Sequence, residues 1–168
     1  MNYSIIIFAI IFLYLFFVWV VLRLIVPHLG FRREPIPGRL PELLAQKIAS
    51  LDAAAADNLG FLRMSYKFVT SRYTGGRMKT IFMPWRAFGD VYTKTPGFLA
   101  CNGQNFLLRT VLVKSGRFSE DDIRIRTVPL NLFIHQYLQV KVENKWIYVD
   151  PWSHFRGIPL GKKSAFIG

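Results

Sequence analysis

The sequence predicts an α+β protein in which early helices and a later helix pack on an antiparallel sheet, with one transmembrane helix ahead of them. Three observations support this class. An uncharged apolar run opens the chain, apolar residues recur at helical spacing as far as Gly116, and they alternate with polar residues beyond it. The 168 residues have room for one domain and an anchor.

The apolar run has the length of a membrane span. Residues 5–22 carry no charge, and the run continues past Arg23 until Pro27 stops it. A helix of this length covers about 33 Å, enough to cross the hydrocarbon core of a bilayer. A cleaved signal peptide would need a basic start and a small-residue cleavage site, and neither is present. We therefore expect an uncleaved anchor over residues 1–27.

Basic residues lie on only one side of this run. No Lys or Arg precedes it, whereas four arginines stand at or after its end: Arg23, Arg32, Arg33 and Arg39. The positive-inside rule therefore predicts a single-pass protein of the cell membrane whose main domain faces the cytoplasm.

The residues after the anchor divide into a linker and one domain. Residues 28–39 contain Gly30, Pro35 and Pro37 and few apolar side chains, which predicts a linker. The domain then covers residues 40–168.

Two helices should open this domain, because apolar residues recur at helical spacing. The first begins at Pro41, and Asp57 either ends it or caps the next helix. The second is broken by Thr-Gly-Gly at 74–76. Their apolar positions are Leu43, Leu44, Ile48 and Leu51 in the first helix and Phe61, Leu62, Met64, Phe68 and Val69 in the second.

A third helix is expected from about Cys101, after the turn-forming Thr-Pro-Gly at 95–97, and Ser115-Gly116 should end it. The aromatic residues 79–92 fit neither period and receive no assignment. Beyond the third helix, alternation predicts strands over 123–126, 134–143 and 146–150, with a turn at 144–145.

Three residues in these elements have the chemistry of a catalytic triad. Cys101 is the only cysteine, which excludes a disulfide scaffold and a four-cysteine zinc site. Its place at a helix start favours the thiolate form. His135 lies on the more polar side of a strand, and Asp150 ends the next strand. A thiol, a histidine and a carboxylate supply a nucleophile, a base and a group that orients the base.

The hairpin that carries the last two residues presents a geometric difficulty. A two-residue turn at 144–145 would pair Asp150 with Gln139, four residues or about 13 Å along the strand from His135. A four-residue loop at 141–144 would instead place His135 opposite Asp150. We therefore predict a longer or bulged hairpin.

Three segments that contain these residues resemble the transglutaminase-like superfamily of papain-related thiol enzymes. They are 101–108 (CNGQNFLL), 135–140 (HQYLQV) and 146–152 (WIYVDPW). The resemblance covers about Leu40 to Trp152 and is most specific in the last part. It implies a transglutaminase-like, papain-like core and a triad of Cys101 as nucleophile, His135 as base and Asp150 as orienter.

The sequence departs from the family pattern at two positions. Ala100 stands where a glycine often precedes the cysteine, and the aromatic residue after the histidine is shifted to Tyr137. No motif marks the oxyanion hole. The backbone N–H of Cys101 is the default donor, with Trp85 and Gln104 as candidates for a second.

Each triad residue also has an ordinary structural explanation. A single cysteine is most often a small core residue, a strand histidine is usually structural, and Asp-Pro commonly ends a strand. His154 is expected to be a loop residue. Because the three histidines are dispersed and there is one cysteine, neither a metal nor a cofactor is expected.

The strong basic charge limits the expected partners. Lys and Arg number 22 against 10 Asp and Glu, for a formal net charge of +12. Such a chain is attracted to phospholipid head groups, nucleic acid or acidic substrates. Because no nucleic-acid-binding motif accompanies the charge, membrane lipid is the expected anionic partner and nucleic acid is not.

Two functions are consistent with these observations. The first is a membrane-anchored thiol enzyme that hydrolyses peptide or amide bonds of a peptide or protein substrate through an acyl-enzyme, with acyl transfer left open. The alternative is a catalytically silent, membrane-tethered domain whose basic surface binds anionic lipid or a protein partner. The sequence leaves the substrate and the oligomeric state open.

Overall fold

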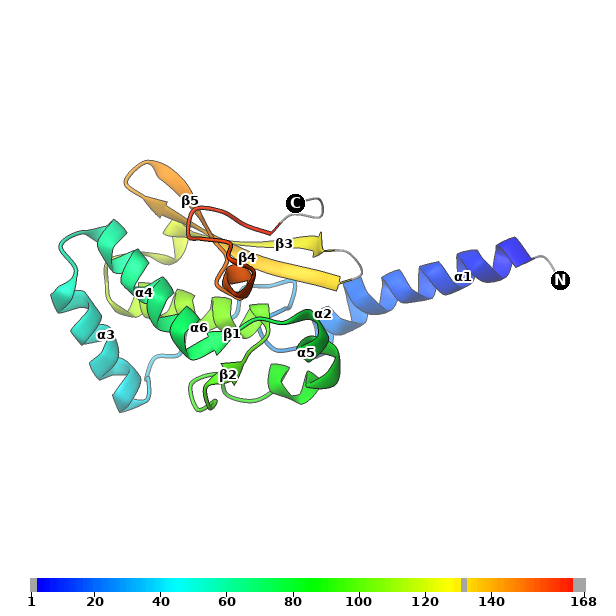
Figure 1. Ribbon diagram of the computed structural model, residues 1–168, viewed down its shortest axis with the longest axis horizontal. Helices are drawn as coiled ribbons and strands as arrows, with labels where there is room; N and C mark the ends of the chain where they lie inside the picture. Colours follow the sequence, from blue (N-terminus) through cyan, green and yellow to red (C-terminus); the bar gives the residue numbers. More distant parts are fainter. Residues whose placement is uncertain (1–2, 131–132, 165–168) are drawn as a thin grey trace.

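A long apolar helix projects from one end of the molecule (Figure 1). In the computed structural model, which describes residues 3–130 and 133–164, it comprises α1 (Tyr3–Phe16), a π-helical turn η1 (Phe17–Val21) and α2 (Leu22–Ile25). Together they form a continuous helix of 23 residues, and its most apolar 18-residue window has a mean hydropathy of 3.2. The predicted helix of membrane-spanning length is therefore present. Only 6% of its most apolar window is buried inside the protein.

The segment after this helix lies against the domain, although it contains neither helix nor strand. The Asn102 side chain donates a hydrogen bond to the carbonyl oxygen of Pro27. The ring of His28 stacks on Phe106 with centroids 3.8 Å apart, and Gln136 Nε2 donates to the His28 carbonyl oxygen at 3.2 Å. The end of the anchor is thus fixed to the helix and the strand that carry the candidate site.

Two helices open the domain, as the periodicity predicts. They are α3 (Glu42–Ala54) and α4 (Asn58–Arg72). Asp57 caps the second of them, because its carboxylate accepts a hydrogen bond from the Gly60 N–H at 2.6 Å. Of the two roles left open for Asp57 by the sequence, the structure selects this one.

The stretch without a sequence assignment forms α5 (Arg77–Phe82) and the 3₁₀ turn η2 (Pro84–Ala87). On either side of it lie β1 (Tyr73–Thr74) and β2 (Gly97–Phe98), which pair in parallel. Strands of two residues are too short to show a period. A Cβ at Gly75 would lie 2.1 Å from the Trp152 carbonyl oxygen, so only glycine permits this close approach.

The third helix, α6 (Cys101–Lys114), begins at the predicted residue. Gly116 follows its end with φ of 77°, the left-handed conformation that favours glycine. Side chains 102–112 are all buried, because α6 lies between α4 and the sheet (Figure 1). Leu62, Val69, Leu108, Val111 and Leu138 are among the core residues where these elements meet.

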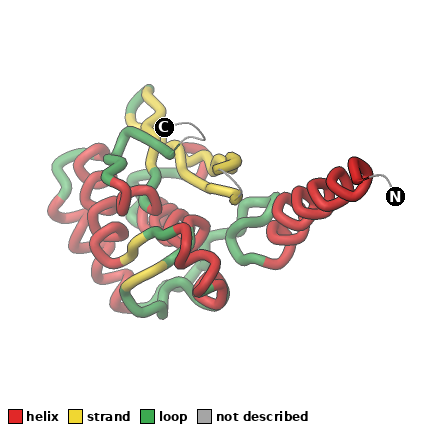
Figure 2. Tube along the Cα trace, turned by 45° about the vertical axis from the view of Figure 1, so that its right-hand side comes forward, coloured by secondary structure: helices red, strands yellow, loops and turns green. Residues whose placement is uncertain are grey.

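The sheet consists of β3 (Ile123–Leu130), β4 (Phe133–Val142) and β5 (Lys145–Val149), antiparallel and in that order. A 3₁₀ turn, η3 (Glu120–Asp122), precedes it and another, η4 (Trp152–Arg156), follows it. Helices cover one side of the sheet (Figure 2). The protein is thus mixed α+β with a small antiparallel sheet and one apolar N-terminal helix.

The β4–β5 hairpin corrects one prediction. Val142 pairs with Lys145, so the turn consists of Glu143 and Asn144, and Glu143 adopts φ of 55°. The expectation of a longer or bulged hairpin is wrong. The turn falls one residue earlier than the simplest alternative at 144–145, which moves the register of β5 by two residues relative to β4.

Candidate active site

Cys101 is the first residue of α6 and is half-buried. Ala100, at the N-cap, makes no side-chain cap hydrogen bond. The first-turn N–H groups of α6 point out of the helix, as they do at any helix start, and the positive end of the helix favours an anion there. A thiolate and the oxyanion of an acyl-transfer intermediate are both such anions.

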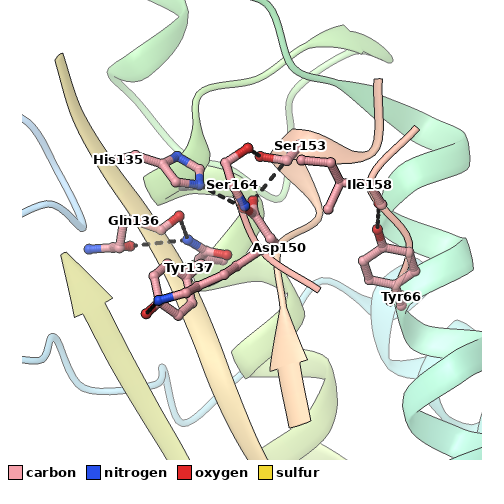
Figure 3. A network of polar contacts seen from close by, with 10 residues as sticks. Tyr66, His135, Gln136, Tyr137, Asp150, Ser153, Ile158 and Ser164 are labelled. Carbon is pink, nitrogen blue, oxygen red and sulfur yellow. Dashed lines mark hydrogen bonds and ion pairs between the residues drawn. The ribbon is translucent and has the colours of Figure 1, made fainter. Parts of the chain in front are cut away.

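His135 and Asp150 form a buried ion pair in the sheet. His135 Nε2 lies 2.8 Å from Asp150 Oδ2, and the side chains are 2% and 0% exposed (Figure 3). The observed register pairs Leu138 with Val149, so Asp150 stands beside Tyr137, two residues along from His135. Asp150 lies beyond the end of β5, and the two side chains span this offset without a bulge.

Backbone N–H groups hold the carboxylate of Asp150 in place. Ser153 N donates to Oδ1 at 3.2 Å, and Ser164 N donates to Oδ2 at 3.0 Å. The two serine hydroxyls lie 2.6 Å apart (Figure 3). The ring of Trp152 packs on that of His135, with centroids 5.1 Å apart. With His135 Nε2 as a third partner, the carboxylate is a fixed acceptor and orients the imidazole.

The pKa of His135 reflects this environment and the neighbouring thiol. Burial by itself lowers the pKa of a histidine. Hydrogen bonds from the imidazole to Asp150 and Cys101, together with the negative charges of these two partners, outweigh burial and raise the pKa of His135 to about 9. Because Nε2 binds Asp150, Nδ1 is the ring nitrogen that remains for Cys101. A protonated imidazole beside a thiol favours the thiolate.

Cys101 and His135 both line a cavity of about 390 Å³ at the anchor end of the domain. The wall around them includes Ala100, Asn102 and Trp152. The structure therefore brings the three predicted catalytic residues together, with Asp150 behind His135. The thiol and the imidazole face a space large enough for a substrate.

The other predicted positions lie outside this cavity. Trp85 is 63% exposed and Gln104 is fully buried, and neither is among the residues that line the cavity. Gln104 Nε2 donates to the Leu99 carbonyl oxygen at 2.7 Å. His154 is exposed on η4, where Nδ1 lies 3.5 Å from the Tyr66 hydroxyl. The backbone N–H of Cys101 remains the candidate oxyanion donor.

Sequence reasoning missed two contributors to the site. Ser164, which is 2% exposed, donates its backbone N–H to Asp150 from the C-terminal segment, for which the sequence predicts no structure. Leu29 is buried and lines the cavity from the segment expected to be a linker. No motif marks either residue, although an apolar residue within a polar linker was the available indication for Leu29.

No group of three or more His, Cys, Asp and Glu side chains suited to a metal ion occurs among residues 3–130 and 133–164. Comparison of the chain with protein-family models, with curated proteins and with solved structures gives no match.

Proposed function

We propose that this chain is a membrane-anchored thiol enzyme of transglutaminase-like type, which cleaves an acyl bond, such as a peptide or amide bond, through an acyl-enzyme. The observation that carries the proposal is the buried His135–Asp150 pair at 2.8 Å, whose imidazole lines the same cavity as the only thiol of the chain. A structural cysteine has no need of such a partner. Cys101 is the nucleophile, His135 the acid and base, and Asp150 the orienter.

The reaction follows from these positions. The Cys101 thiolate attacks the substrate carbonyl carbon, and the first-turn N–H groups of α6 stabilise the oxyanion. The intermediate collapses to a thioester as the leaving amine takes a proton from His135. Water then gives a proton to His135 and attacks the thioester, which releases the acid and restores the thiolate. An amine in place of water gives acyl transfer by the same steps.

The membrane part of the proposal depends on the N-terminal helix. Its length, hydropathy and almost complete exposure within the protein are those of a membrane span and unlike those of a core helix. The arginines after it favour a domain on the cytoplasmic side of the cell membrane, by the positive-inside rule. Fractionation with an alkaline wash tests the anchor, because a cleaved leader would leave the domain in the soluble fraction.

The test of the chemistry is the rate of Cys101 alkylation by iodoacetamide as a function of pH. It uses the full chain in detergent, since residues 27–34 pack against α6 and β4. We expect rapid alkylation of the wild type at about pH 7. In His135→Ala the rate should fall by roughly 10-fold or more, because the thiolate loses the imidazole that stabilises it. His154→Ala, which removes an exposed histidine that is not among the residues lining the cavity, is the matched control and should keep the original rate.

The same experiment decides the alternative function. Equal alkylation rates in the wild type, His135→Ala and His154→Ala would contradict the enzyme. The catalytically silent, membrane-tethered domain would then be favoured. A hollow beside the anchor lined by Arg23, Arg32, Arg33 and Arg109 is the observation that would support lipid binding in that case.

A further inference from the structure

The cavity in front of Cys101 and His135 is largely apolar and has the anchor as one wall. Its sides come from the last turns of the anchor helix, from the α5–η2 segment and from the ends of β3 and β4. Apolar residues that form them include Leu22, Ile25, Ile81, Ala87, Phe133 and Ile134. The reactive thiol and imidazole therefore open into a space shared between the domain and its own membrane helix.

The size and chemistry of the cavity indicate what it holds. A methylene group takes up slightly less than the about 30 Å³ of a water molecule, so 390 Å³ accommodates an unbranched chain of about a dozen carbons. A peptide backbone in the same place would leave N–H and C=O groups without partners against apolar walls, which is costly. A hydrocarbon chain has no such groups.

The α5–η2 segment shows how such a chain could reach the cavity. It exposes large apolar side chains, namely Met78, Ile81, Phe82 and Trp85, with Phe88 directly after it. Arg77, Lys79 and Arg86 are interleaved with them. Apolar and basic residues together, with a tryptophan among them, are typical of a segment that lies in the membrane interface. The segment lies beside α2, at the anchor end of the domain (Figure 1).

We propose that the substrate is a long-chain acyl compound drawn from the bilayer, whose hydrocarbon chain fills this cavity with its carbonyl carbon at Cys101. This inference rests on the proposed function and names its substrate class. The thiolate forms a thioester with the acyl carbonyl, the bond to the leaving alcohol or amine breaks, and that group takes a proton from His135. Water, deprotonated by His135, then releases a fatty acid.

Arg77 adds a polar feature to this substrate. It lines the cavity, and its buried Nε has no hydrogen-bond partner within the described part of the chain. A guanidinium in this position suits a phosphate or carboxylate near the acyl carbonyl. A phospholipid head group and a free anionic acyl compound share this chemistry.

The first experiment compares two esters that differ in chain length. The full chain in detergent is assayed with p-nitrophenyl acetate and p-nitrophenyl laurate. Each buried methylene is worth about fourfold in binding, so we expect kcat/KM for laurate to exceed that for acetate by at least about 10-fold. Ala87→Trp narrows the cavity and should lower this ratio by about 10-fold. The acetate rate of the same sample reports that the site is folded.

A laurate-to-acetate ratio of kcat/KM near one, or a ratio that Ala87→Trp leaves unchanged, would overturn the proposal of a long-chain acyl substrate. The iodoacetamide experiment shows which proposal has failed. His135-dependent alkylation together with a ratio near one leaves the thiol enzyme in place and removes only its long-chain substrate. Alkylation that is independent of His135 removes both.

The second experiment tests delivery from the membrane and the source of the chain. Fatty acid release is measured with vesicles of phosphatidylcholine and phosphatidylglycerol. Phe82→Glu should lower release by about 10-fold, whereas Leu43→Glu, at an even more exposed apolar position on α3, should not. Equal release by the two variants would contradict an interfacial role for α5–η2.

Two further comparisons belong to the vesicle assay. Arg77→Gln should lower release from phosphatidylglycerol more than Lys79→Gln, which removes the same charge from the exposed side of the same helix. Release from vesicles identifies phospholipid as the source of the chain. Cleavage of laurate without such release identifies a free acyl compound, and absence of both overturns the proposal.

Discussion

The two sides of the candidate site are held by different forces. On the sheet side, His135 and Asp150 are buried and fixed by an ion pair and by backbone donors from Ser153 and Ser164. On the helix side, Cys101 is half-buried at the start of α6 and faces walls that are mostly apolar. The polar side is fixed by hydrogen bonds, while the apolar side provides space. Substitutions on the helix side should therefore affect mainly activity, and substitutions on the sheet side should also affect the free energy of unfolding.

The largest expected effect is on the helix side and concerns activity alone. Cys101→Ala removes the proposed nucleophile, so turnover of any acyl substrate should fall by about 10³-fold or more. The free energy of unfolding should change by less than about 1 kcal/mol, because a small, half-buried side chain is lost. Activity and urea unfolding of the same preparation measure the two effects. Substantial residual turnover would show that Cys101 is not the nucleophile.

The next effect is on the sheet side and includes stability. Asp150→Ala leaves buried His135 without its partner and two backbone N–H groups without an acceptor. Breaking a buried ion pair in this way typically costs about 3–5 kcal/mol of stability. Urea unfolding followed by tryptophan fluorescence would measure the loss. Asp90→Ala, at an exposed loop carboxylate, is the control. Equal losses of unfolding free energy in the two variants would show that the buried ion pair does not stabilise the sheet side.

The pH dependence of stability should also come from the sheet side. The folded pKa of His135 is raised to about 9, above its ordinary value of 6.5. The stabilisation is therefore fully present below about pH 6.5 and is lost as pH rises through about 9. A shift of this size corresponds to about 3 kcal/mol. The free energy of unfolding of the wild type and of His135→Gln, measured across this pH range, tests the prediction. If the two depend on pH in the same way, another group is responsible.

The smallest effect concerns Gln104, a buried residue of α6 that is a candidate oxyanion donor on sequence grounds. Gln104→Ala removes the hydrogen bond to the Leu99 carbonyl oxygen, which should cost about 1 kcal/mol of stability. Cys101 alkylation should change by less than about threefold, since no transition-state charge is stabilised by Gln104. An oxyanion donor would instead cost about 10²–10³-fold in turnover. A loss of turnover of that size, with the rate of alkylation preserved, would show that Gln104 is an oxyanion donor.

The sequence alone determined the apolar N-terminal helix, the three long helices of the domain and the three long strands, but not α5 or η2. Apolar spacing over many residues sets the period, and Asp57, Gly116 and the turn before Cys101 mark the ends. Local pattern also separated the apolar helix from the rest of the chain and indicated the three candidate catalytic residues. These features depend on neighbours in the sequence, so a single chain is enough to reveal them.

Only the tertiary structure decided the hairpin register, the burial of the ion pair and the walls of the cavity. The turn at Glu143-Asn144 differs by one residue from another plausible turn, and nothing local distinguishes them. Ser164 reaches Asp150, and Leu29 reaches the cavity, across long stretches of chain. Such contacts arise from the packing of distant segments. The sequence thus supplied the candidate catalytic groups, and packing supplied their geometry and the apolar space in front of them.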